Sequence, residues 1–182
     1  TWSNLNSSTA FRSLDINDAG YVVAISNATF LVVNAADNSV VATGGDVGVG
    51  EYRCVAIDSD NIIWIGGEGG LARVEGFSSS RVTKYTSVTG VNADGTFNRS
   101  SMRSSYINDI AIVDRHLRYV ATLTGIEKMM GSQFMNMNVH NYHLVSNNVY
   151  RLKWDASTSS LWASSLCQLH EIVFRDAAHE SI

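Results

Sequence analysis

The chain has 182 residues, which is enough for one domain with a sizeable hydrophobic core. Only 16% of the residues are charged, against roughly 25% in average soluble domains, and the formal net charge is −4. There is no basic run and no apolar run of about 18 residues, so the sequence predicts neither nucleic-acid binding nor a membrane span.

Four units of similar pattern follow one another along the chain. Each begins with a stretch in which apolar and polar residues tend to alternate, and these stretches start at Phe11, Tyr52, Ile107 and Val149. The starts are 41, 55 and 42 residues apart. Apolar residues recur at the fourth position (Leu14, Val55, Ile110, Leu152) and at the sixth (Ile16, Ile57, Ile112, Trp154). Alternation with a period of two predicts a β-strand at the start of each unit.

Two further strands are expected in each unit. The second strands are predicted at residues 21–25, 63–67, 119–122 and 161–164, after turns rich in Asp, Asn and Gly such as residues 17–20 and 58–61. We align the first unit with a one-residue deletion before Tyr21. A small residue then recurs in the second strand, at Ala24, Gly66, Ala121 and Ala163, which predicts a close approach between blades. The third strands are expected around Phe30/Val33, Leu71/Val74, Ile126/Met129 and Leu169/Ile172.

A period of about 40 residues with several short strands per repeat is typical of propeller blades. We therefore predict an all-β fold: a β-propeller or partial propeller of about four blades, with mostly antiparallel sheets. The expected units are residues 11–50, 51–105, 106–148 and 149–182, within a single domain of residues 1–182. The alternative is a β-sandwich whose strands are periodic by accident.

In the second unit, from Asp58 to Arg73, an Asp-rich turn is followed by Trp-Ile-Gly and then by Gly-Leu and a basic residue. This segment resembles the repeat of a known family, the two-component-regulator propeller. The first and third units lack this Trp, and only the fourth keeps one nearby, Trp162. The resemblance implies propeller blades like those in the periplasmic or extracellular part of bacterial sensor kinases. It implies sensing less directly, because nothing in the sequence resembles a kinase or a receiver.

Residues 89–105 interrupt the repeat and predict a long exposed loop. One hypothesis is a loop that contacts a partner through Phe97, Arg99, Met102 and Arg103. The alternative is an insertion without a role.

The methionine-dense residues 129–139 suit either core and blade-edge packing or an adaptable interface. Trp64, Tyr119 and Trp162 are expected in the blade cores. Cys54 and Cys167 are expected to be buried free thiols, and the alternative is a disulfide that joins the first and last units.

The sequence predicts no catalytic, cofactor or metal site. His140 and His143 are three residues apart, but no Cys, Asp or Glu lies close in sequence to complete a metal site. The glycine-rich residues 44–50 lack both dinucleotide-binding spacing and a phosphate-loop lysine. We therefore predict a protein that is not an enzyme.

The functional prediction is a structural or protein-interaction component of a larger extracellular, cell-surface or virion assembly. Its partners would be other protein chains or the remaining blades of a longer polypeptide, because the sequence begins at Thr1 rather than Met and four blades are few for a ring. Residues 1–5 and 172–174 are the candidate ring-closing strands. The alternative is a sensor module of a bacterial surface protein that binds a glycan or a peptide.

Overall fold

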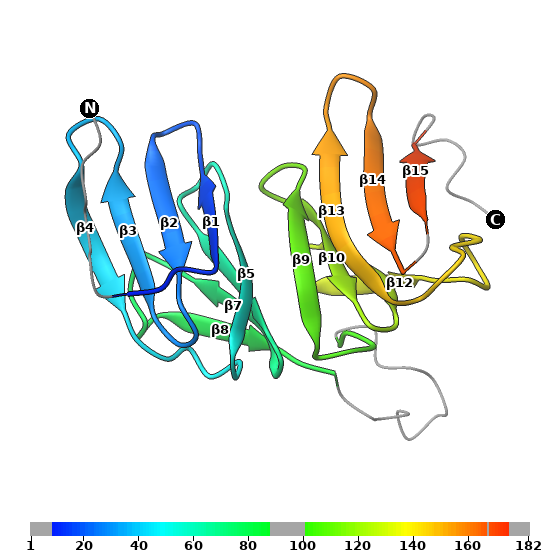
Figure 1. Cartoon of the computed structure of the whole chain (residues 1–182), viewed down its shortest axis with the longest axis horizontal. Helices are drawn as coiled ribbons and strands as arrows, with labels where there is room; N and C mark the ends of the chain where they lie inside the picture. The colour runs from blue at the N-terminus through cyan, green and yellow to red at the C-terminus, as the bar shows by residue number, and fades with distance from the viewer. Residues whose placement is uncertain (1–8, 88–100, 167, 175–182) are drawn as a thin grey trace.

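The computed structural model describes residues 9–87, 101–166 and 168–174, and Figure 1 shows how their strands are arranged. The regular secondary structure of these residues consists of strands alone. The strands are β1 (Ser13–Ile16), β2 (Tyr21–Ile25), β3 (Phe30–Asn34), β4 (Ser39–Gly44), β5 (Tyr52–Ile57), β6 (Ile63–Gly67), β7 (Gly70–Val74), β8 (Val82–Tyr85), β9 (Ile107–Ile112), β10 (Leu117–Thr122), β11 (Gly125–Met130), β12 (Gln133–Met137), β13 (Val149–Asp155), β14 (Ser160–Ser165) and β15 (Leu169–Val173).

Consecutive strands form four antiparallel sheets, which we call blades. Blade 1 contains β1–β4, blade 2 β5–β8, blade 3 β9–β12 and blade 4 β13–β15. The first strands of the blades pack in succession, β1 on β5, β5 on β9 and β9 on β13. This is the arrangement of a partial β-propeller, in which blades follow one another around a central axis, so the predicted fold is confirmed. The predicted boundaries of the four units stay a prediction.

The blades form an open arc. In Figure 1 the sheets of blades 1 and 4 are seen face on, on either side of the middle, and blades 2 and 3 lie behind them. Within the described part of the chain, successive blades pack extensively from blade 1 to blade 4, and no comparable packing joins blade 4 to blade 1.

The predicted strands agree with the structure in most places. β5, β9 and β13 begin at the predicted residues, but β1 begins at Ser13 rather than at Phe11. The reason is that β2 ends at Ile25, which pairs with Ser13, so Phe11 has no partner residue on β2. The predicted turns are also confirmed: Gly20 has a φ of 81° and Asn61 a φ of 61°, values that Gly and Asn tolerate.

The predicted column of small residues is only partly correct. Gly66 and Ala121 occupy one position on the face toward the next blade, whereas Ala24 and Ala163 lie on the opposite face of their blades. The deletion assumed before Tyr21 does not exist, because Ile16 pairs with Val22 across the same turn length as Ile57 with Ile63. In blade 4 the turn is one residue longer, since Trp154 pairs with Leu161.

Three hydrophobic clusters hold neighbouring blades together. The first joins blades 1 and 2, the second joins blades 2 and 3, and the third joins blades 3 and 4. Trp64 and Tyr119 are buried in the second and third clusters, as predicted. The methionine-dense segment is the β11–β12 hairpin at the outer side of blade 3, where Met129 and Met137 are buried while Met130 and Met135 are exposed.

The cysteine prediction can be followed for one residue. Cys54 is buried and free, and burial raises the pKa of its thiol. Cys167 lies outside the described residues, and so do the candidate closing segment at residues 1–5 and residues 89–100 of the predicted loop.

Candidate functional site

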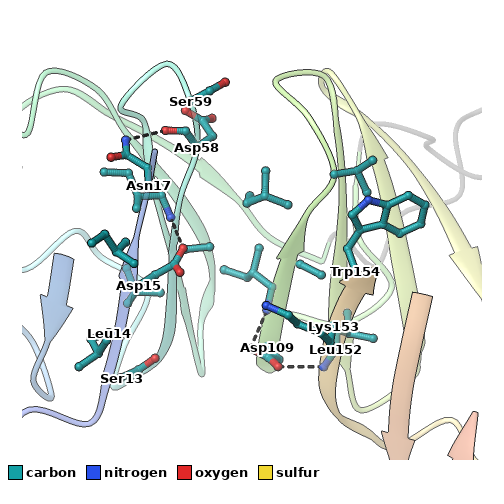
Figure 2. A pocket seen from close by; sticks show the side chains of 18 of the residues that line it. Ser13, Leu14, Asp15, Asn17, Asp58, Ser59, Asp109, Leu152, Lys153 and Trp154 are labelled. Atoms are coloured by element: carbon teal, nitrogen blue, oxygen red, sulfur yellow. Dashed lines mark hydrogen bonds between the residues drawn. The ribbon is translucent and has the colours of Figure 1, made fainter. Parts of the chain in front are cut away.

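A groove runs between the first strands of the four blades. Its volume is about 410 Å³, and it is lined by residues of β1, β5, β9 and β13 together with the turns that follow the first three of these strands. Figure 2 shows Asp15 and Asn17 on one side of the groove and Asp109, Lys153 and Trp154 on the other. The groove lies where a complete propeller has its central channel.

Two aspartates in the groove connect neighbouring blades. Asp15 of β1 accepts a hydrogen bond of 2.9 Å from the backbone N–H of Ile57 in blade 2. Asp109 of β9 accepts one of 2.8 Å from the N–H of Leu152 in blade 4, and one of 3.0 Å from Ile110. Each carboxylate therefore satisfies an N–H of an inner strand in the following blade.

The turn after β5 is organised by Asp58, the first residue of the family-like segment. Its carboxylate accepts hydrogen bonds from the N–H groups of Asp60 and Ile62 and from Nε1 of Trp64, each of 3.0 Å. Asn17 donates to the carbonyl of Asp58 at 3.0 Å and so connects the corresponding turn of blade 1. The Asp of the repeat pattern thus holds the turn in its conformation, and its hydrogen bond to the Trp side chain connects this turn to the core of the blade.

The groove is acidic. Five aspartates line it (Asp15, Asp18, Asp58, Asp109 and Asp114), and Lys153 is the one cationic side chain among the lining residues. Burial raises the pKa of Asp109, whereas hydrogen bonds from backbone N–H groups lower that of Asp114. Four of the five carboxylates accept backbone hydrogen bonds, so their arrangement serves the fold. Among the described residues no three His, Cys, Asp or Glu side chains are grouped to hold a metal ion.

Only two of the four residues predicted to contact a partner lie in the described part of the chain. Met102 is 2% exposed and packs in the cluster between blades 2 and 3, so it is a core residue in this structure. Arg103 is exposed, and its backbone N–H donates to Glu127 at 2.8 Å. Phe97 and Arg99 lie outside the described residues. Partner binding by this loop stays a prediction.

Sequence reasoning missed a second candidate surface, the uncovered faces of the two end blades. Leu14 in blade 1 is 67% exposed, whereas its counterparts Val55, Ile110 and Leu152 are 6–8% exposed. Ile16 is 54% exposed, and its counterpart Ile57 is 4% exposed. The apolar fourth position is thus buried by a preceding blade in blades 2, 3 and 4, and exposed in blade 1, where the arc begins.

The uncovered face of blade 4 carries Trp162, which is half-buried, and Leu169, which is 67% exposed. Trp162 is the counterpart of Trp64 and Tyr119, which the next blade covers completely. In blade 2 this cover includes Arg118 of blade 3, whose guanidinium lies 4.0 Å from the Trp64 ring centroid. Exposed apolar faces of this kind mark interaction surfaces.

The chain is a β-propeller module, and comparisons with known proteins agree at the level of fold. No family model and no curated protein matches it. Among solved structures it is similar to the computationally designed Ika4 protein, with 12% identity and a TM-score of 0.62 over 96% of this chain and 100% of that one.

Two natural proteins are also similar in structure. One is the extracellular domain of BT4673 from B. thetaiotaomicron, described as a one component system, with 17% identity and a TM-score of 0.64. The other is YCF48 bound to D1 peptide, with 13% identity and a TM-score of 0.67. The matches cover 94% and 93% of this chain, but 22% and 52% of those chains. This chain therefore spans about a fifth of the first and half of the second. No helix in the described residues is long and apolar enough to cross a membrane.

Proposed function

We propose that the chain is a non-enzymatic propeller module of a larger extracellular assembly, and that it acts by packing against other polypeptide. The observation that carries this proposal is the exposure of Leu14 at a position where all three counterparts are buried by a neighbouring blade. The exposed face of blade 1 is apolar, like the buried interfaces between the blades. Such a surface is better suited to contact with another protein than to contact with water.

The free energy available from covering this face follows from the exposures. Burial of a complete Leu or Ile side chain is worth about 1.5–3 kcal/mol, so covering the exposed parts of Leu14 (67%) and Ile16 (54%) contributes roughly 2–4 kcal/mol together. That corresponds to a factor of roughly 30–700 in an association constant from two side chains. Trp162 and Leu169 on the other open face add to it.

The known structures support a binding role outside the cytoplasm. BT4673 provides an extracellular domain with this fold, and YCF48 provides a propeller bound to a peptide. Because propeller folds host unrelated functions, the fold alone does not decide between binding and catalysis. The proposal that the module is not an enzyme is supported by the groove, where four of the five carboxylates are engaged by backbone N–H groups.

The test is sedimentation velocity of the 182-residue chain over a wide range of concentrations, alone and with candidate extracellular partners. We expect a complex whose formation is weakened by Leu14→Ser and left unchanged by Asp18→Ala, a substitution at an exposed turn residue of the same blade. A chain that stays monomeric, binds no protein and responds equally to both substitutions would overturn the proposal.

A second candidate function is recognition of a glycan or peptide in the central groove. The observation in its favour is the groove itself, with Trp154 beside an acidic wall. Titration of oligosaccharides and of cationic peptides should then change the fluorescence of the wild-type chain and leave that of Trp154→Phe unchanged. No change in either protein would exclude this function for the ligands tested.

A further inference from the structure

The proposed function leaves the partner open, and we infer that it is a second copy of this chain. The inference rests on the proposed function. Blade 4 of each copy packs on blade 1 of the other, so that two arcs of four blades close one ring around a two-fold axis through the central groove. Three observations lead to this arrangement.

The first observation is that each position of an inner strand always faces the same neighbouring blade, either the preceding one or the following one. The fourth and sixth residues of each unit face the preceding blade: Val55 and Ile57 belong to the cluster with blade 1, and Leu152 to the cluster with blade 3. The fifth residue faces the following blade, as Asp15 shows by its bond to Ile57 and Ala111 by its place in the cluster with blade 4. Every covered junction thus joins a fifth-position face to a fourth-and-sixth-position face.

The second observation is that the two open faces are the two halves of such a junction. Blade 1 presents the fourth and sixth positions, Leu14 and Ile16, which need a preceding blade. Blade 4 presents the fifth position, Lys153, with Trp162 and Leu169 on the same face, which need a following blade. One chain therefore carries both complementary surfaces, and identical chains satisfy both at once.

The third observation is the shape of the arc. In Figure 1 the sheets of blades 1 and 4 extend to opposite sides of the middle and are both turned to the viewer, with the other two blades behind. The uncovered faces are therefore on the same side of the molecule. A single partner of the same shape, rotated by half a turn, covers both faces and leaves no free end. Closure distinguishes this pair from an open-ended filament.

The uncovered part of blade 1 is its inner side. Leu31 and Val33, which lie farther out on the same face as Leu14 and Ile16, are already buried. The second copy therefore approaches mainly through its inner strand β13, and Lys153 of that copy lies beside Ile16, as Asp15 lies beside Ile57 within the chain. This contact between positions 16 and 153 gives the proposal a specific test.

The experiment measures molar mass by light scattering during size exclusion, on the full 182-residue chain and three variants. The wild type is expected at twice the chain mass of 19.8 kDa. Ile16→Lys places an ammonium group beside Lys153 of the second copy and should give monomers. Combining Ile16→Lys with Lys153→Glu converts this repulsion into an ion pair and should restore the dimer. Met130→Lys is the matched control, because Met130 is 58% exposed but belongs to blade 3, away from the open faces.

A wild-type monomer, a species that grows with concentration, a dimer that survives Ile16→Lys, or a failure of Lys153→Glu to rescue it overturns the inference. Circular dichroism of Ile16→Lys confirms that the monomer is folded, and if it is not, Leu14→Gln takes its place. If the wild-type monomer binds a different protein and loses it with Leu14→Ser, the inference fails while the proposed function stands.

Discussion

Gly66→Ala tests how closely blades 2 and 3 approach one another. A Cβ atom on Gly66 would lie 2.5 Å from Sγ of Cys54 in the same blade and 2.5 Å from Cγ2 of Ile107 in the next. Cys54 is 2% exposed and Ile107 is fully buried, so neither side chain has room to move aside. The variant must therefore separate the two blades or force a side chain out of its preferred rotamer.

The expected cost is that of overpacking a tight core, about 1–3 kcal/mol. For a domain of this size each kcal/mol lowers the melting temperature by roughly 2–4 °C, so we expect a decrease of roughly 2–12 °C. Urea unfolding followed by tryptophan fluorescence measures the same change, with a lower midpoint and an unchanged slope.

Gly45→Ala is the matched control. Nothing lies within 4 Å of a Cβ on Gly45, so its free energy of unfolding should stay within about 0.5 kcal/mol of the wild type. Adding Cys54→Ala to Gly66→Ala removes one of the two clashes, and the pair should couple favourably in a double-mutant cycle. Equal stability of Gly66→Ala and Gly45→Ala would refute the close approach of the blades.

Three further predictions concern single polar groups. Asp15→Ala leaves the buried N–H of Ile57 without its acceptor and should cost about 1–3 kcal/mol in urea unfolding, whereas Asp15→Asn, which keeps an oxygen, should cost less; equal losses would contradict this role. Burial raises the pKa of Glu127 above its ordinary 4.5, so its contribution to stability is present below the unfolded pKa and is lost as the pH rises through the folded pKa. Glu127→Gln should lack this loss as the pH rises above the ordinary value of 4.5, and parallel pH profiles of the two proteins would argue against it. In a Cys167→Ser chain, Cys54 should react with a thiol reagent only as fast as the protein opens, and rapid labelling of the native chain would show that the thiol is accessible.

The sequence predicted the strands best where the alternation was unbroken and a turn signal bounded it. The segment from Tyr52 to Val74 meets both conditions, and its three strands appear at the predicted positions. The outer strands β4, β8 and β12 were not predicted, because they lie at blade edges and alternate weakly. In β8, for example, exposed Lys84 and half-buried Tyr85 carry no clear pattern. In β12 the run of methionines conceals the alternation of buried Met137 and exposed Met135.

The site was harder to predict than the fold. An aspartate between two apolar residues of a strand, as in Leu14-Asp15-Ile16, reads as an ordinary solvent-facing residue in an alternating pattern. Its bond to the N–H of Ile57 depends on how the next blade approaches, which no local pattern contains. Asp109 escaped notice for the same reason, because its acceptor role is directed at Leu152, 43 residues away.

The open faces of blades 1 and 4 can be related to the repeat pattern once it is known which neighbouring blade each position faces. The fourth positions are all apolar, so the sequence cannot tell that Leu14 alone is uncovered. At the fifth position the units differ, with Asp15 and Lys153 at the ends and Ala56 and Ala111 between them. Two large apolar side chains that lie mostly in solvent, Leu14 and Ile16, form the kind of surface that marks an interaction site. The apolar pair is therefore the feature that argues for a covering blade. Lys153 carries a charge on the open face of blade 4. A substitution there therefore tests whether blade 4 of a second copy is the blade that covers Leu14 and Ile16.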